Sequence, residues 1–453
     1  MLLLARYVLP VSEPFIDDGA VYVRDGEIID VGGREALLAR YPDAEIKDYG
    51  QAALMPGFVD LHTHFEFSVF RGMVNDAPYS QWKMQVMEKE KGVSPHSWER
   101  SAFLGAVETI RCGITTVADV TDSGASVLPV ASAKLRAVIY REVSTMDKSQ
   151  VDRVMDEALG DLNEWGSVVD PRLVTIGLAP HSPYSCHPEL IKRVAEYASA
   201  HDTPVAIHLA GSKDEYDFVR YGSSSLGQDY RSQAGWSQLA WLPTGVSPVK
   251  YVLQWGILDV PNVLAVHCVH TDAADIEVLA SRDVAVAYCA RCNLKLGMGI
   301  APLQELLERG VRVGIGTDSP ASNSTVDFFD EMRIGLLVQR GVVGEARFYP
   351  SERFIRMATL DGARALRIDH LVGSLEPGKR ADIIAVDLSR NHQVPTTDPY
   401  SAVVHVANQE DVLMTMVDGR VLYERGEYFT VHVGGLSDEI ERIQRRLREA
   451  PVE

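Results

Sequence analysis

The sequence has no long uninterrupted apolar run, and this absence excludes an apolar helix that crosses a membrane. Residues 1–10 are apolar, but Arg6 interrupts them and no small-residue cleavage site follows, so we expect no signal peptide. Cysteine is also scarce: five in 453 residues, an odd number that does not indicate a disulfide framework. A reducing compartment fits this usage, and we expect a cytoplasmic protein.

Positively charged residues are fewer than negatively charged ones. The chain has 44 Lys and Arg against 63 Asp and Glu, which gives a net charge of −19. So acidic a surface argues against nucleic acid or an anionic membrane as a partner. Apolar residues make up 46% and charged residues 24%, as in ordinary globular proteins. At this length we expect one large domain and a smaller one.

From residue 56 onward, apolar and β-branched segments alternate with helical patterns such as 188–201, 272–282 and 302–309. Eight βα units predict an α/β fold, a (β/α)8 TIM barrel, whose chemistry lies at the carboxyl ends of its strands. The eight expected strands are Ala53–Leu61, Ile114–Val120, Leu135–Glu142, Arg172–Ala179, Pro204–Leu209, Asn262–His267, Val284–Tyr288 and Val311–Thr317.

Both ends of the chain read as short strands joined by turns. In the first segment, Asp25-Gly26 is a hairpin signal. After the barrel, a turn-rich link precedes further strands, and residues 437–449 predict an exposed helix. We therefore expect a small β-sandwich domain composed of residues 1–55 and 371–453, with the barrel over residues 56–370.

The polar residues at the expected strand ends form a pattern. His62 and His64 share one face of the first strand, because alternate side chains point the same way. Other strands end at or just before a single polar residue, and random placement would not put so many histidines there. These residues are His181, His208, His267 and Asp318.

Three histidines and one aspartate at such positions suit one divalent metal ion, zinc best, with iron or manganese possible. Such a metal lowers the pKa of its water to about 7. Asp318 could bind the metal and also accept the proton, while His267 could stabilise a developing oxyanion. Alone, His208 or His267 would more often be a core histidine and Asp318 a helix cap, but together with the His-x-His pair they favour a metal site.

Six segments follow one another along nearly the whole chain: PGFVDLHTHFEFS, LAPHSPYS, VAIHLA, AVHCVH, CNLKLGMGIAPLQELLERGVRVGIGTDSPASN and GSLEPGKRADIIAVD. In this order they resemble the amidohydrolase superfamily and in particular its cytosine-deaminase-like branch. That branch includes triazine hydrolases and deaminases of S-adenosylhomocysteine, methylthioadenosine and aminodeoxyfutalosine.

The resemblance implies roles for matching residues and, often, a homodimer. His267 matches a histidine that contacts the attacking water. His181 matches a substrate-contacting position, and Asn293 falls in a loop where relatives hold the substrate. Glu66 and Arg71, just after the His-x-His pair, are our further candidates for substrate contact. The metal ligands implied are His62, His64, His208 and Asp318.

One position departs from the branch. Its deaminases usually carry a proton-shuttling glutamate three residues after the strand-five histidine, where this chain has Gly211. Glu215 is the nearest acid, but Ser212 to Glu215 fits a capping box, and we favour the structural role. Glu66 is the second candidate for the shuttle.

Three functions remain open from the sequence. The leading hypothesis is a metal-dependent deaminase of an aminated nitrogen heterocycle. The alternative is a hydrolase with another leaving group, such as chloride, an alkylamine or a cyclic amide nitrogen, which Gly211 favours. A non-catalytic binding protein on this scaffold is the third hypothesis, and the set of metal-ligand candidates argues against it.

Trp236, Trp241 and Trp255 either line an aromatic substrate pocket or pack within an enlarged helical connection after the fifth strand. Gln81, Trp82 and Glu88 are candidates for a lid over the site.

Overall fold

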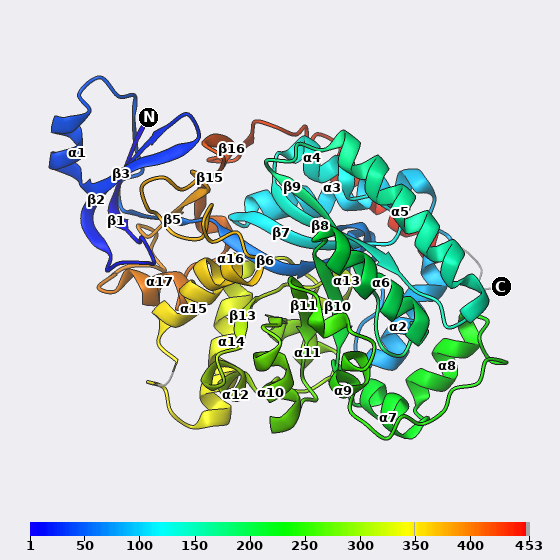
Figure 1. Ribbon diagram of the computed structural model, residues 1–453. Coiled ribbons are helices and arrows are strands. Elements are labelled where there is room, and N and C mark those ends of the chain that lie inside the picture. The colour runs from blue at the N-terminus through cyan, green and yellow to red at the C-terminus, as the bar shows by residue number, and fades with distance from the viewer. Residues whose placement is uncertain (348, 450–453) are drawn as a thin grey trace.

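The computed structural model describes residues 1–347 and 349–449. Its larger part is a parallel sheet of eight strands in the order β6 to β13, which confirms the expected barrel (Figure 1). Each strand pairs with its neighbour in sequence, as βα units require. The strands are β6 (Phe58–Thr63), β7 (Ile114–Thr121), β8 (Arg136–Val143), β9 (Val174–Pro180), β10 (Val205–Leu209), β11 (Val263–His267), β12 (Ala285–Tyr288) and β13 (Arg312–Ile315).

The first and last barrel strands meet where both end. The backbone N–H of Asp318 donates to the carbonyl of His62 at 2.7 Å. The buried carboxylate of Asp60 accepts the backbone N–H of Thr317 at 2.9 Å and its hydroxyl at 2.6 Å. Asp60 also accepts the N–H of His62 at 3.2 Å. These bonds fix the two strand ends that carry metal-ligand candidates relative to each other.

The expected strand over residues 53–61 is wrong as a single element. The structure divides it into β5 (Ala52–Pro56) and β6, which belong to different sheets. Gly57 marks the break: its N–H donates to Asp382 at 3.0 Å, and a Cβ there would lie 2.1 Å from the Thr115 side chain. Only glycine lets the chain pass so close to β7 and switch sheets.

Strands from both ends of the chain build the second sheet, as expected. All nine belong to one sheet, ordered β17-β16-β15-β14-β5-β1-β2-β3, with β4 paired to β1. The segments meet where β5 pairs with β14 in antiparallel register. Its strands are β1 (Leu2–Val8), β2 (Ile16–Arg24), β3 (Glu27–Gly33), β4 (Ile46–Asp48), β5, β14 (Ile383–Asp387), β15 (Val412–Val417), β16 (Arg420–Glu424) and β17 (Glu427–Tyr428).

Helices follow most barrel strands, and the three expected from sequence are α6, α10 and α12. No helix among the described residues is both long and apolar enough to cross a membrane. The helices are α1 (Arg34–Arg40), α2 (Tyr79–Glu90), α3 (Pro95–Arg111), α4 (Val127–Ala133), α5 (Val151–Val168), α6 (Pro188–His201), α7 (Lys213–Tyr221), α8 (Ser225–Gln233), α9 (Pro248–Leu253), α10 (Ala273–Ser281), α11 (Ala290–Lys295), α12 (Leu303–Glu308), α13 (Pro320–Asn323), α14 (Phe328–Val343), α15 (Ser351–Ala358), α16 (Leu360–Ala365), α17 (Pro399–His405) and α18 (Leu436–Glu449).

The last helix, α18, returns to the barrel. Glu439 accepts a hydrogen bond from Arg100 on α3 at 2.8 Å, and Gln444 donates to the carbonyl of Val69 at 3.0 Å. Thus α18 follows the small sheet in sequence but packs on the larger part of the molecule. The division into 1–55, 56–370 and 371–453 stays a prediction.

Candidate active site

Three histidine side chains converge at the carboxyl ends of the strands. The Nε2 atom of His208, from β10, lies 3.2 Å from that of His62 and 3.4 Å from that of His64. A tetrahedral zinc with bonds of about 2.0–2.1 Å holds neighbouring nitrogens about 3.4 Å apart. Oδ1 of Asp318 lies 3.8 Å from Nε2 of His62. The spacing of the imidazoles therefore fits a zinc-sized ion, and a carboxylate oxygen of Asp318 lies within 4.8 Å of ring nitrogens of His62 and His64.

The protonation of the rings also suits a metal. Nδ1 of His208 lies 2.9 Å from the carbonyl oxygen of His181. A carbonyl only accepts, so Nδ1 carries the hydrogen and Nε2 presents its lone pair. Burial lowers the pKa of His208 to about 4 and holds the pKa values of His62 and His64 well below the ordinary value. All three rings are neutral near pH 7, as metal binding requires.

His267 completes the cluster from β11. Its Nε2 lies 3.9 Å from Oδ2 of Asp318, and its Nδ1 lies 2.9 Å from Oδ1 of Asn293. Burial lowers the pKa of His267 to about 4. Asn293 is 1% exposed and does not line the pocket. The structure therefore places Asn293 behind His267, as the group that orients the ring, and not in the position expected for substrate contact.

The backbone is strained where these strands end. Four residues other than glycine have positive φ there: Ala210 (51°), His267 (75°), Cys268 (46°) and Asp318 (61°). Such conformations are uncommon outside glycine and cost on the order of 1–3 kcal/mol each. Their concentration at the ends of β10, β11 and β13 indicates that the position of these side chains is maintained at the expense of stability.

A pocket opens onto the cluster. Its cavity volume is about 40 Å³, room for only a few waters. Aromatic walls come from α2 and from the loop after β6, so admission of a larger ligand requires these side chains to move. The lining residues are His64, Phe67, Tyr79, Trp82, Lys83, Glu142, His181, His208, His267, Leu296, Asp318 and Ser319.

His181 lies where the resemblance places a substrate-contacting residue. It lines the pocket and is 5% exposed. Its Nδ1 lies 2.6 Å from Oγ of Ser185, and its ring packs edge-on against Tyr184, which shares a 2.7 Å hydrogen bond with Tyr79 of α2. The ring is thus held by one nitrogen, which leaves Nε2 available to a ligand.

Two charged pocket residues were not identified from the sequence. Glu142 is the next-to-last residue of β8, and one of its oxygens lies within 4.8 Å of ring nitrogens of His181 and His208. Burial raises the pKa of Glu142 to about 8. Lys83 reaches the pocket from α2. Glu142 could have been found, because it ends an expected strand; Lys83 could not, because its approach depends on how α2 packs.

Glu66 and Arg71 lie outside the pocket lining. The buried Glu66 carboxylate accepts hydrogen bonds from the Thr121 hydroxyl at 2.7 Å, from the Asp122 N–H at 3.0 Å and from the Ser123 N–H and hydroxyl. Arg71 donates to Glu108 at 2.6 Å. The structure thus gives these two residues partners within the protein and does not bring them to the metal-ligand candidates.

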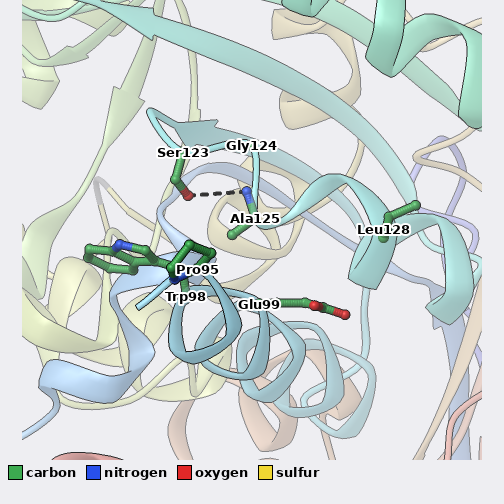
Figure 2. A pocket seen from close by; sticks show the side chains of 7 residues that line it. All are labelled: Pro95, Trp98, Glu99, Ser123, Gly124, Ala125 and Leu128. Atoms are coloured by element: carbon green, nitrogen blue, oxygen red, sulfur yellow. Dashed lines mark hydrogen bonds between the residues drawn. The ribbon is translucent and has the colours of Figure 1, made fainter. Parts of the chain in front are cut away.

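A second pocket lies beside the loop after β7 that binds the Glu66 carboxylate (Figure 2). Its cavity volume is about 310 Å³, and Ser123 in its wall hydrogen-bonds to the N–H of Ala125. None of the expected site residues lines it. Its lining residues are Pro95, Trp98, Glu99, Ser123, Gly124, Ala125 and Leu128.

The loop after β10 is held by Glu215. The carboxylate accepts the N–H groups of Ala210 at 2.8 Å and Gly211 at 2.9 Å, while the N–H of Glu215 donates to Oγ of Ser212 at 3.1 Å. Glu215 therefore has the structural role expected, although its carboxylate binds two residues upstream of Ser212. It too lies outside the pocket lining.

All three tryptophans after β10 pack against aromatic neighbours, and Trp255 lies edge-on to Tyr251. Trp241 stacks on Phe218 with ring centroids 4.9 Å apart, and Trp236 lies 5.8 Å from Tyr230. Trp255 likewise does not line the pocket. Of the lid candidates on α2, only Trp82 does. The packing interpretation of these tryptophans is therefore favoured.

The chain is also similar to known proteins. The pattern of the amidohydrolase family matches residues 53–422, most of the chain. The chain belongs to the amidohydrolase family. A bacterial imidazolonepropionase-like composite domain also matches residues 19–44, within the N-terminal strands of the small sheet.

Individual members of this amidohydrolase family are similar over nearly the whole length. A 5-methylthioadenosine/S-adenosylhomocysteine deaminase of Moorella thermoacetica is 34% identical over 94% of each chain. A 5'-deoxyadenosine deaminase of Methanothermobacter thermautotrophicus is 34% identical over 90% of each chain. The solved structure of an adenosine deaminase from Xanthomonas campestris, with bound zinc, is 27% identical, with a TM-score of 0.87 over 99% of this chain and 98% of that one.

Proposed function

We propose that the protein is a metal-dependent hydrolytic deaminase of adenine nucleosides such as 5-methylthioadenosine, S-adenosylhomocysteine or 5'-deoxyadenosine. The observation that carries this proposal is the convergence of three neutral imidazoles and Asp318 in one aromatic-walled pocket. Aromatic walls suit a flat heterocycle. The names of the relatives supply the nucleoside class.

We propose one zinc ion per chain, held by three imidazoles whose spacing suits it and by the neighbouring carboxylate of Asp318. When bound, such a metal lowers the pKa of a water molecule and supplies a nucleophile near neutral pH. Burial keeps the ligand imidazoles neutral, so no proton must be expelled from them. The proposed ligands are His62, His64, His208 and Asp318.

The protein's own groups then divide the remaining work. Oδ2 of Asp318 and Nε2 of His267 lie 3.9 Å apart, so one oxygen atom can lie within hydrogen-bond distance of both. Asp318 is placed to accept a proton from the attacking water, and Nε2 of His267, which carries no hydrogen, to accept a hydrogen bond from that water and orient it. His181 offers Nε2 to the heterocycle, and the side chains of α2 exclude water around it.

A second candidate function remains, favoured by Gly211. Gly211 has no carboxyl group to protonate a leaving amine, whereas a leaving group such as chloride would need less assistance. The same metal site would serve this hydrolase.

The deciding experiment measures ammonia release from the metal-loaded protein with each of the three nucleosides and with cytosine, guanine and pterin compounds as comparison. We expect release from at least one adenine nucleoside. The same ring bearing chloride in place of the amino group distinguishes the second candidate: chloride release without any ammonia release would establish it and overturn the deaminase.

We also propose that the protein works in the cytoplasm as a homodimer. Its five cysteines are free and buried, which is compatible with a reducing compartment. Light scattering tests the second part, and a monomeric mass at assay concentrations would contradict it.

A further inference from the structure

Two carboxyl groups line the candidate active-site pocket in the described part of the chain, Asp318 and Glu142. Asp318 is the proposed metal ligand and base. The other two acids weighed from the sequence are fully engaged elsewhere: Glu66 by the hydroxyl and N–H groups of the loop after β7, and Glu215 by the N–H groups of the loop after β10. Glu142 is the carboxyl group left to act on a bound ligand.

Glu142 is half-buried and lacks the contacts that would give it a structural role. Its carboxylate makes no hydrogen bond or ion pair with any residue in the described ranges, although ring nitrogens of His181 and His208 lie within 4.8 Å. A carboxyl group with no protein partner, in a pocket this small, faces whatever enters the pocket. The nearby Lys83 does not reach ion-pair distance, so Glu142 is not committed to a salt bridge.

The position just after β10 has little room for a side chain. A Cβ on Gly211 would lie 3.0 Å from Cε of Met298 and 3.2 Å from Cδ2 of His267. Gly211 follows β10 and His267 ends β11, whereas Glu142 comes from β8, on the other side of β10 in the strand order. Among the described residues, the acid that reaches the pocket from the side of β8 and β9 is Glu142.

We propose that Glu142 is the catalytic acid that delivers a proton to the leaving amine; this inference rests on the proposed deaminase function. The water oxygen bonds to the ring carbon as Asp318 takes one of its protons. The carbon–nitrogen bond then breaks, its electron pair goes to nitrogen, and ammonia departs with the proton from Glu142. The proton on Asp318 returns through solvent to Glu142, so each turnover consumes one water and releases one ammonia.

The test compares Glu142→Gln with the native protein on two substrates that differ only in the leaving group, amino or chloride, on one ring. Glutamine keeps the shape but has no proton to give. A general acid contributes typically about 10²- to 10⁴-fold in rate, so we expect kcat for ammonia release to fall by that factor. Chloride departs without a proton, and its release should change by less than about tenfold. Glu157→Gln, an exposed pair partner of Arg153, is the matched control and should leave both rates unchanged.

Other results overturn the proposal. An equal loss of both rates, or a rise in KM with kcat retained, would make Glu142 a positioning residue only. Loss of zinc from Glu142→Gln would make it a metal ligand, and unchanged ammonia release would remove it from the reaction. If the native protein releases chloride but no ammonia, the deaminase function fails on its own; a loss of chloride release in Glu142→Gln would then also reject Glu142 as an amine-specific acid. Glu142→Asp, which keeps a carboxyl group, should recover part of the ammonia rate.

Discussion

Oδ1 of Asn293 lies 2.9 Å from Nδ1 of His267, so a residue of α11 fixes the orientation of an imidazole ring on β11. An amide oxygen only accepts hydrogen bonds, so Nδ1 of His267 must carry the hydrogen and Nε2 must be free of it. That nitrogen points toward Asp318. The tautomer and the ring orientation of His267 thus depend on one buried amide.

Replacing Asn293 by alanine should lower kcat and leave the zinc content unchanged, because the ring of His267 loses its orientation while the four metal ligands remain. His267→Ala should lose more, about 10²- to 10³-fold in kcat, the size of loss typical when one hydrogen-bonding group at the reacting oxygen is removed. Steady-state kinetics with metal analysis on both variants checks this. Parallel loss of zinc and rate in His267→Ala would identify His267 as a metal ligand.

Removing metal should abolish turnover without unfolding the barrel, whose apolar core does not include the ligands. We expect about one zinc per chain in the purified protein. Chelation, or His208→Ala, should leave the circular dichroism spectrum in place and reduce activity to background, and added zinc should restore only the chelated protein. Normal metal content and rate in His208→Ala would contradict the proposed site.

Glu66→Gln should reduce stability and leave kcat within about twofold, because its carboxylate binds Thr121, Asp122 and Ser123 and does not line the pocket. An amide supplies one acceptor oxygen where the carboxylate supplies two, and the loss should be about 1–3 kcal/mol. Chemical denaturation followed by assay of the folded fraction measures both effects. A large fall in kcat with stability retained would return Glu66 to the proton-shuttle role.

Glu215→Gln should change how stability depends on pH. Burial raises the pKa of Glu215 from its ordinary 4.5 to about 7. Between pH 4.5 and about 7 the Glu215 carboxyl holds a proton in the folded protein that it releases in the unfolded chain. Its contribution to the free energy of unfolding is therefore full below pH 4.5 and is lost as the pH rises through about 7. Urea denaturation on either side of the window should show a shallower pH dependence in the variant. An unchanged slope would mean that Glu215 titrates normally in the folded protein.

The parts of the fold that repeat were predictable from the sequence. The barrel strands are mostly buried and rich in apolar residues, so most of their positions follow from composition, and His62 and His64 share a face because of the strand period. The divided first strand was not predictable, since Gly57 is needed only because the chain there passes within contact of Thr115, a contact between segments far apart in sequence.

The candidate site divides in the same way. Residues at strand ends, such as His208 and Asp318, are placed by the barrel itself. Residues on loops and helices were misjudged or missed: Asn293 turns away from the pocket, and Lys83 enters it, because of how α11 and α2 pack. Tertiary packing, which no local pattern records, decided both.

The pairing of β5 with β14 has a consequence for the newly made chain. As the polypeptide leaves the ribosome, β5 is complete before any barrel strand exists, but its partner begins only at Ile383. One edge of β5 therefore stays unpaired throughout synthesis of the barrel. An unpaired strand edge made of apolar residues is a site for aggregation. The nascent chain therefore needs protection at β5 until β14 emerges.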